Sequence, residues 1–492
     1  MARRTSTLEW AVPPRSTGGP AYRWLYGALR SAILKGRLPR GARLPATRDL
    51  ARQYVLARGT VVNAYEQLKS EGYIEGSAGS GTYVSRVLPE QWLQVDAPVG
   101  KQPTARRLRA LPVSDYSRRV QLFTTYENRP VRAFRANLPA LDLFPVELWT
   151  RLSNRCLRRA PISQWMGCDA LGYTPLRQAI ADYLTTSRGV KCAPEHVAIV
   201  SGVQEALDIA CRLFVNPGDA VCMERPGYPG AQLAFRAWGA RVRKVAVDTD
   251  GANVARLPRG MKLIYITPGH QFPLGTTMSL ARRMEVLDWA RRTGAVVFED
   301  DYDGEFRYSG RPIPAMQGLD ESGTVLYAGS FSKVLFPGLR LGYLVSPNGL
   351  VDRVAAIKSI TSRHCPVAEQ VVLSQFMVEG HFARHVRRMR EVYAERLSVL
   401  LEEGRSVLAG LLELSAVEAG LQTVGWLGNG LESEAAEAAA RERGVDVTSL
   451  RGYGDKKLRG LHLGFAAVRP AEIRRGVREL AIALESQKRG VR

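Results

Sequence analysis

Near the N-terminus, apolar residues recur at the spacing of amphipathic helices in three short segments. The first helix is predicted over residues 21–36, the second over 44–54 with Thr47 as its N-cap, and the third over 60–72. Residues 72–84 then alternate around a turn of glycine and serine, which predicts a β-hairpin. The residues expected on the buried helix faces are Leu25, Ala28, Leu29, Ala32 and Ile33 in the first helix, and Val61, Ala64, Tyr65 and Leu68 in the third.

From about residue 130 onward, short apolar runs alternate with amphipathic helices, two of which are predicted over 175–189 and 279–294. Strand and helix in turn, with short breaks of glycine or proline, indicate an α/β domain with a mainly parallel sheet. Ligands of such sheets bind at the carboxyl ends of the strands. The apolar runs expected to form strands are residues 196–202, 219–225, 262–269, 295–301 and 324–330.

The 492 residues are too many for one ordinary domain. Residues 86–115 contain several prolines, few periodic apolar positions and mixed charge, which is typical of a linker. The expected parts are a helix-and-hairpin domain over 15–86, a linker over 87–118 and an α/β domain over 119–490, the last with a large subdomain over about 165–365 and a small C-terminal subdomain over about 366–490.

The formal net charge of +22 is uneven, because residues 1–86 hold fourteen Arg or Lys against five Asp or Glu, a net of +9. Two helices around a turn, followed by a glycine-rich hairpin, form the pattern of a winged helix-turn-helix, whose second helix enters the major groove of double-stranded DNA. A generally basic, arginine-rich proteome is the alternative explanation of the charge, and a small helical domain whose basic face is merely solvated is the alternative to DNA binding. The residues expected to contact DNA are Arg48, Arg58, Thr60 and, in the turn of the wing, Gly79.

The sequence does not favour a membrane protein, a disulfide-bonded secreted protein or a metal-binding protein. No run of about eighteen apolar residues predicts a membrane span, and six scattered cysteines without a C-x-x-C pair indicate reduced thiols in a cytoplasmic compartment. His381 and His385 are spaced for one helix face, but no cysteine or carboxylate joins them there. We therefore expect no metal site.

Polar motifs follow the predicted strands in order. Residues 201–207 place a serine and a glycine at a strand-to-helix turn, where backbone N–H groups can hold a phosphate. Residues 224–230 add an aromatic ring beside glycine and proline, and 298–306 place several carboxylates after an apolar strand, where they need cationic partners. Residues 330–342, "SFSKVLFPGLRLG", set Lys333 between two serines and an arginine.

One ligand would use all of these groups: pyridoxal 5′-phosphate (PLP). Its aldehyde needs a lysine amine, and its ring nitrogen needs a carboxylate that keeps it protonated. Its ring face accepts an aromatic stack, and its phosphate accepts N–H groups, hydroxyls and a guanidinium. A lysine in an apolar site also loses its proton more easily, as imine formation requires. The alternative is that Lys333 is an ordinary loop lysine.

The order S-G-x-Q, P-G-Y, D-x-Y and S-x-S-K-x-x-x-P-x-x-R-x-G resembles fold-type I aminotransferases. With the winged helix, residues 20–480 resemble the MocR-type subgroup of GntR-type bacterial regulators, for which "HQFPLG" and "EDDYDGEFRY" are quite specific. The resemblance implies that Lys333 forms the Schiff base and that Asp300 faces the pyridine nitrogen. It further implies that Tyr302 contacts the ring hydroxyl, that Tyr228 stacks on the ring, and that Ser330, Arg340, Gly202, Val203 and Gln204 hold the phosphate.

Three positions depart from the aminotransferase pattern. His462 stands where an arginine usually clamps the substrate carboxylate, and a neutral imidazole cannot make that bidentate contact. Phe272 replaces an asparagine that bonds to the ring hydroxyl, a change that the MocR-type subgroup shares. Cys168 stands where a tyrosine normally reaches the phosphate of the neighbouring subunit, with Tyr173 a few residues on.

The resemblance implies a homodimeric, DNA-binding transcription regulator that binds PLP as its effector and reads repeated half-sites. Because Tyr228 is followed by Pro229 and Gly230 rather than by arginines, the chain resembles the PdxR-like branch, which senses PLP and controls vitamin B6 synthesis genes. The alternative is a PLP-dependent aminotransferase with an appended DNA-binding module. A third possibility, a structural protein that has lost the cofactor, is disfavoured by the intact lysine motif.

Overall fold

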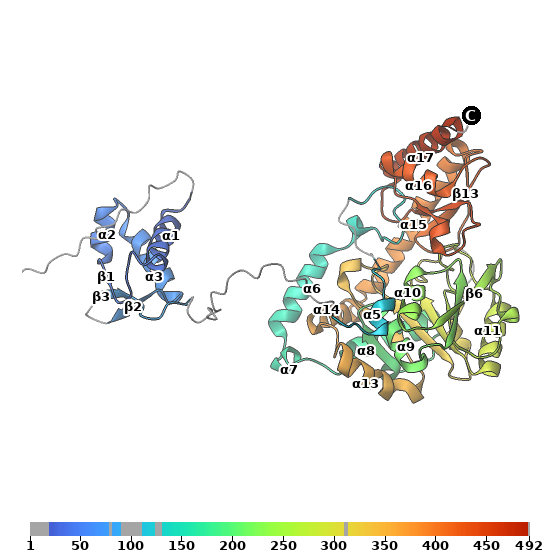
Figure 1. The fold of residues 1–492 in the computed structure, drawn as a ribbon, viewed down its shortest axis with the longest axis horizontal. Coiled ribbons are helices and arrows are strands. Elements are labelled where there is room, and N and C mark those ends of the chain that lie inside the picture. The colour runs from blue at the N-terminus through green and yellow to red at the C-terminus, as the bar shows by residue number, and fades with distance from the viewer. Residues whose placement is uncertain (1–18, 78–80, 90–110, 124–129, 309–312, 491–492) are drawn as a thin grey trace, which may run out of the picture. The chain divides into compact units, whose positions relative to one another are not determined.

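The computed structural model describes residues 19–77, 81–89, 111–123, 130–308 and 313–490 (Figure 1). The chain divides into two compact units, Met1–Leu111 and Pro112–Arg492. Each unit has its own hydrophobic core.

The described residues of the first unit form three helices and a small antiparallel sheet in the order β1-β3-β2. All nine residues predicted on the faces of the first and third helices are buried, so that pattern is confirmed. Strand β1 was not predicted, because two residues are too few to show an alternation. The elements are α1 (Ala21–Leu34), β1 (Arg43–Leu44), α2 (Thr47–Gln53), α3 (Arg58–Ser70), β2 (Ile74–Ser77) and β3 (Gly81–Val84).

The predicted N-cap of the second helix is wrong by one residue. Ala46 is the N-cap, with an extended backbone, and no side chain caps the helix. Thr47 is already the first helical residue, so its hydroxyl lies within the first turn instead of below it.

The second unit is built around an eight-stranded sheet in the order β4-β11-β10-β9-β8-β5-β6-β7. In this order, the strands from β10 to β6 pair in parallel. Strand β11 pairs antiparallel with β10 and β4, and β7 pairs antiparallel with β6. The mainly parallel sheet and all five predicted strands are therefore confirmed. The strands are β4 (Val197–Val200), β5 (Ala220–Arg225), β6 (Arg241–Asp248), β7 (Gly251–Ala252), β8 (Met261–Ile266), β9 (Val296–Asp301), β10 (Val325–Ser330) and β11 (Gly342–Val345).

Helices cover both faces of this sheet, because its strands are apolar on both sides. In β8, Leu263 and Tyr265 pack with α9, α10 and α13, whereas Ile264 and Ile266 face α11. Helix α8 packs against the β4 and β11 end of the second face. These helices are α8 (Thr174–Arg188), α9 (Val203–Phe214), α10 (Pro229–Ala237), α11 (Leu280–Thr293) and α13 (Val351–Thr361).

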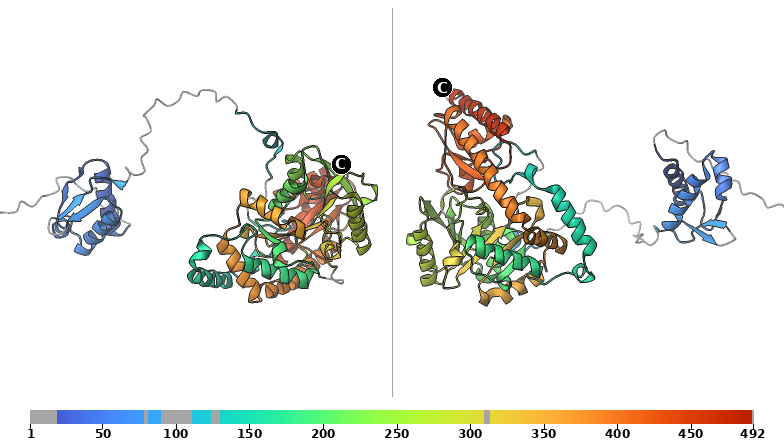
Figure 2. Two further views of the ribbon diagram at one scale, coloured as in Figure 1. Left: turned by 90° about the horizontal axis from the view of Figure 1, so that it is seen from below. Right: turned by 180° about the vertical axis from the view of Figure 1, so that it is seen from behind.

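The C-terminal segment forms a separate lobe at one end of this unit, drawn in orange and red in Figures 1 and 2. A four-stranded antiparallel sheet in the order β12-β13-β15-β14 packs with three helices. Its central strand β15 is buried along its whole length. The elements are α15 (His381–Val407), β12 (Leu412–Leu414), β13 (Gln422–Leu427), α16 (Ser433–Glu442), β14 (Thr448–Ser449), β15 (Gly460–Gly464) and α17 (Pro470–Gly490).

Helix α5 (Asp115–Arg119) overlaps the end of the predicted linker. It belongs to the second unit, which begins at Pro112. In the described parts of the chain, no helix is long and apolar enough to cross a membrane. The remaining helices are α6 (Val146–Arg159), α7 (Ile162–Trp165), α12 (Met316–Leu319) and α14 (Val367–Val378), and short 3-10 turns lie at Leu141–Leu143, Pro194–His196, Val254–Arg256, Pro337–Leu339, Asn348–Leu350 and Leu450–Tyr453.

Candidate functional site

The sheet brings the predicted cofactor residues to its carboxyl edge. Strands β9 and β10 are parallel neighbours, with Asp300 opposite Ala328, so the residues that follow the two strands lie at one edge. Lys333 comes three residues after the end of β10. Tyr228 follows β5, and Gly202 follows β4.

Lys333 is held by the chain segment that precedes the sheet. Its Nζ donates a hydrogen bond of 2.8 Å to the backbone carbonyl of Asn137, a residue with a left-handed backbone at φ 65°. Withdrawal from water lowers the pKa of the Lys333 amine to about 8, against the opposing effect of Asp303 and Asp300. A neutral amine is therefore accessible near neutral pH, as imine formation requires.

Asp300 is 4% exposed and lies at the end of β9. Its Oδ2 accepts a 2.6 Å hydrogen bond from the hydroxyl of Tyr265, and its Oδ1 is buried without a partner. Burial, with smaller contributions from the neighbouring Asp301 and Asp303, raises the pKa of this carboxyl to about 7, against the opposing effects of the Tyr265 bond and Lys333. A buried carboxyl oxygen without a partner is costly, and an N–H donor on a bound ligand would satisfy it.

Tyr228 connects several parts of the site. It is the N-cap of α10, and its hydroxyl accepts a 3.1 Å bond from Gln204. Its ring stacks on Tyr265 at 6.2 Å between centroids and meets Phe272 edge-on at 5.7 Å. Burial raises the pKa of Tyr228 to about 12, so the hydroxyl keeps its proton.

The predicted phosphate residues lie at the start of α9. Gly202 has φ 139°, which favours glycine, and it precedes Val203 and Gln204 in the first turn, where N–H groups lack helical partners. The guanidinium of Arg340 comes within 3.6 Å of the point where a β-carbon on Gly202 would stand. Arg340 itself has a left-handed backbone, with φ 51°. Ser330 accepts a 3.2 Å bond from the backbone N–H of Ser332.

A buried pair of an imidazole and a carboxylate was not predicted from the sequence. Nδ1 of His270 lies 2.9 Å from Asp303, and both side chains are 1% exposed. The hydroxyl of Tyr302 lies 3.1 Å from the same nitrogen. The "HQFPLG" and "EDDYDGEF" motifs contained these residues, but their pairing depends on two loops that meet only in the fold.

His462 lies in β15 with no exposed surface. Its Nδ1 is 3.0 Å from the hydroxyl of Tyr453, and its Nε2 has no partner. Burial, with a smaller effect from His270, lowers the pKa of His462 to about 3, so the ring is neutral. Phe272 packs edge-on against His462, Tyr453 and Tyr302, which places this neutral ring beside the candidate site.

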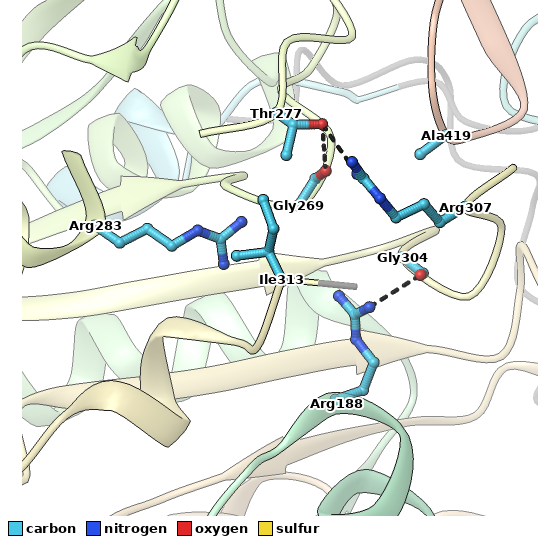
Figure 3. A pocket seen from close by; sticks show the side chains of 8 residues that line it. All are labelled: Arg188, Gly269, Thr277, Arg283, Gly304, Arg307, Ile313 and Ala419. Atoms are coloured by element: carbon cyan, nitrogen blue, oxygen red, sulfur yellow. Dashed lines mark hydrogen bonds between the residues drawn. The ribbon is translucent and has the colours of Figure 1, made fainter. Parts of the chain in front are cut away.

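A small cavity of about 10 Å³ lies behind the 267–275 loop (Figure 3). Three guanidinium groups line it, and Arg283 among them is fully buried and donates to three backbone carbonyls, of Met278, Pro268 and Pro314. Arg188 pairs with Asp301, which fixes the carboxyl end of β9. The hydrogen bonds of Arg283 hold the loop in place, and the cavity is too small for a cofactor.

Together, these groups fit PLP. The unpartnered oxygen of Asp300 suits a protonated ring nitrogen, Tyr228 offers a ring face, and the α9 turn with Arg340 suits a phosphate. The Lys333 amine lies at the same edge of the sheet. The cofactor would supply an electron-withdrawing ring, while these side chains bind and orient it.

In the first unit, Arg48 and Arg58 are exposed near the starts of α2 and α3, and Thr60 is partly exposed. Gly79 lies outside the described residues. The guanidinium of Arg43 in β1 lies beside Gly81 of the wing, 2.9 Å from where a β-carbon on Gly81 would stand.

Comparisons with known proteins agree with this two-part architecture, a helix-turn-helix module joined to a fold-type I aminotransferase-like domain. Residues 21–84 match the model of the bacterial regulatory proteins of the gntR family, and residues 167–480 match that of aminotransferase class I and II. The chain belongs to the MocR-like transcription regulators of the gntR family. It is 38% identical over 482 residues to the probable rhizopine catabolism regulatory protein MocR of Rhizobium meliloti, covering 96% of each chain.

A second regulator and a solved aminotransferase structure are more distantly similar to this chain. The pyridoxine biosynthesis transcriptional regulator PdxR of Corynebacterium glutamicum is 28% identical over 443 residues, covering 89% of this chain and 90% of that protein. Among solved structures, the α-aminoadipate aminotransferase LysN of Thermus thermophilus, complexed with a phosphopyridoxyl-leucine, has a TM-score of 0.70 and 28% identity, covering 77% of this chain and 98% of that one. The fold-type I architecture predicted from the sequence is confirmed.

Proposed function

We propose that this regulator binds PLP through Lys333 and responds to it by changing its affinity for DNA. The observation that carries this proposal is the unpartnered Oδ1 of buried Asp300, at the same sheet edge as Lys333. A ligand that binds one conformation of the large unit more tightly shifts the population toward it, and DNA affinity changes by linkage. Tyr302, Ser330 and the α9 turn are proposed as further cofactor contacts.

The finer proposal is that PLP is itself the effector and that the target genes serve vitamin B6 synthesis. Its support is the neutral, buried His462, which cannot clamp the carboxylate of an amino acid. The distant PdxR relative adds support, although the relative named MocR is more similar. A DNA fragment upstream of a vitamin B6 synthesis gene should bind, with an affinity that changes with PLP and not with amino acids.

We further propose a homodimer that reads repeated half-sites. Ile162, Trp165 and Met166, on and just after α7, are 80%, 66% and 84% exposed, and large neighbouring apolar groups are uncommon on a surface that stays in water. A second copy is the proposed occupant of this surface. Sedimentation of wild type and Trp165→Asp would test it, with a monomeric variant as the expected result.

The first experiment is an absorption spectrum of the purified chain with PLP, wild type beside Lys333→Ala. A visible band that requires Lys333 and persists when amino acids are added supports the proposal. A band that converts and turns over with amino acids would identify an aminotransferase instead. The absence of any band would refute PLP binding and leave the DNA-binding module unaffected.

A further inference from the structure

The segment that leads from the linker into the second unit lies along α10. Tyr116 of α5 packs edge-on against Trp238, with 5.5 Å between the ring centroids. Arg119 donates from Nε to the carbonyl of Ala237 at 3.2 Å, and its guanidinium covers Gly239. In Figure 1, α5 and α10 are accordingly neighbours.

The same segment ends at the candidate cofactor site. The ring of Phe123 meets that of Tyr228 edge-on, with 5.9 Å between centroids and 76° between planes. Tyr228 is the residue proposed to stack on the cofactor ring. A chain segment that begins at the linker thus touches the site through one aromatic contact.

Tyr228 is well placed to respond to both ends of a bound cofactor. Its hydroxyl accepts a bond from Gln204, in the turn proposed to hold the phosphate. Its ring stacks on Tyr265, whose hydroxyl bonds to Asp300, the proposed partner of the ring nitrogen. A cofactor that fixes Gln204 and Asp300 would therefore restrict Tyr228 and the face that it offers to Phe123.

The segment itself is weakly held. Helix α5 has five residues, none of them buried, and so short a helix is not stable without tertiary contacts. Its partner is firmly fixed, because Trp238 donates to Asp208 at 2.9 Å and carries the guanidinium of Arg212 over its ring. A marginal segment on a rigid surface is the kind of element whose order a small change can shift.

We propose that residues 112–123, the docking segment, transmit the occupancy of the cofactor site to the linker through the contact between Phe123 and Tyr228. This inference rests on the proposed PLP binding. When the cofactor fixes Tyr228, the docking segment becomes more firmly seated on α10, and the length of chain between the DNA-binding module and this docking point shortens. In the absence of PLP the segment detaches more often and that length increases.

The test is hydrogen exchange of the full chain, with and without PLP, followed by mass spectrometry. The amides of Arg118 and Val120 bond to carbonyls within the segment and report its order. We expect PLP to slow exchange in peptides covering 112–123 by at least about threefold. Phe123→Ala should abolish that slowing, whereas Leu122→Ala, at a neighbouring side chain that is 91% exposed, should retain it.

Absorption spectra of the same samples separate the possible failures. If the visible band forms in wild type but exchange over 112–123 does not change, transmission through this segment is refuted. The Phe123 contact is likewise refuted if Phe123→Ala keeps the slowing, or if it loses the band and so proves to be a cofactor-binding residue. If wild type shows no band, PLP binding itself fails, and this inference fails with it.

Discussion

Replacement of Asp300 by asparagine tests the electrostatics of the site most directly. The pKa of this carboxyl is about 7 in the cofactor-free fold against an ordinary 3.8, so the folded protein holds its proton more tightly than the unfolded chain does. Because the unfolded chain loses that proton first, the stability of the cofactor-free protein falls as the pH rises from about 4 to about 7. Asp300→Asn removes the ionisation while keeping the size and the acceptor for Tyr265.

The expected gain in the stability of Asp300→Asn follows from the size of the pKa shift of Asp300. A difference of about three pKa units corresponds to an upper limit of about 4 kcal/mol above pH 8, and to less than about 2 kcal/mol at pH 5. For a unit of this size, the gain at pH 8 would raise its melting temperature by on the order of 5 °C. The variant should also gain less stability from added PLP than wild type does, because a neutral amide cannot neutralise a protonated ring nitrogen.

The assay is scanning calorimetry of the full chain, freed of PLP with hydroxylamine, between pH 5 and pH 8. Wild type with and without PLP serves as the reference. Any loss of packing in the variant is independent of pH. The decisive quantity is therefore how much the difference in stability between variant and wild type changes from pH 5 to pH 8. If that difference is the same at pH 5 and pH 8, the assignment of the buried, proton-holding carboxyl is wrong.

Three further predictions concern other parts of the chain. His462→Arg should restore a carboxylate clamp and tighten binding of an α-amino acid to the PLP-loaded protein by at least about tenfold, measured by spectral titration; unchanged affinity would show that His462 does not face the ligand. Arg58→Ala should weaken binding to any DNA duplex and reduce the slope of log K against log salt by about one, which an unaltered slope would contradict. Leu29→Ala should destabilise the first unit by about 2–5 kcal/mol, whereas Leu34→Ala, at a 42% exposed position, should have little effect on the same calorimetric transition.

Much of the candidate site could be predicted because its residues follow buried strands in parallel order. The lysine motif, Asp300 and Tyr228 each come at the end of an apolar run, and parallel strands bring such ends together. The pairing of His270 with Asp303 could not be predicted in this way, since it depends on the approach of two loops. The protonation of Asp300 and of His462 also depends on burial, which only the packed structure determines.

The local structure of this protein follows from short-range patterns in its sequence. Periodic apolar positions specified the faces of α1 and α3, and continuous apolar runs specified the central strands, because both patterns depend on neighbours a few residues apart. The place of α5 in the second unit and the contact of Phe123 with Tyr228 depend on long-range packing. These contacts join residues about a hundred positions apart, and no short-range pattern can encode them. The docking of the segment on α10, and its contact with the cofactor site, therefore depend on the fold as a whole.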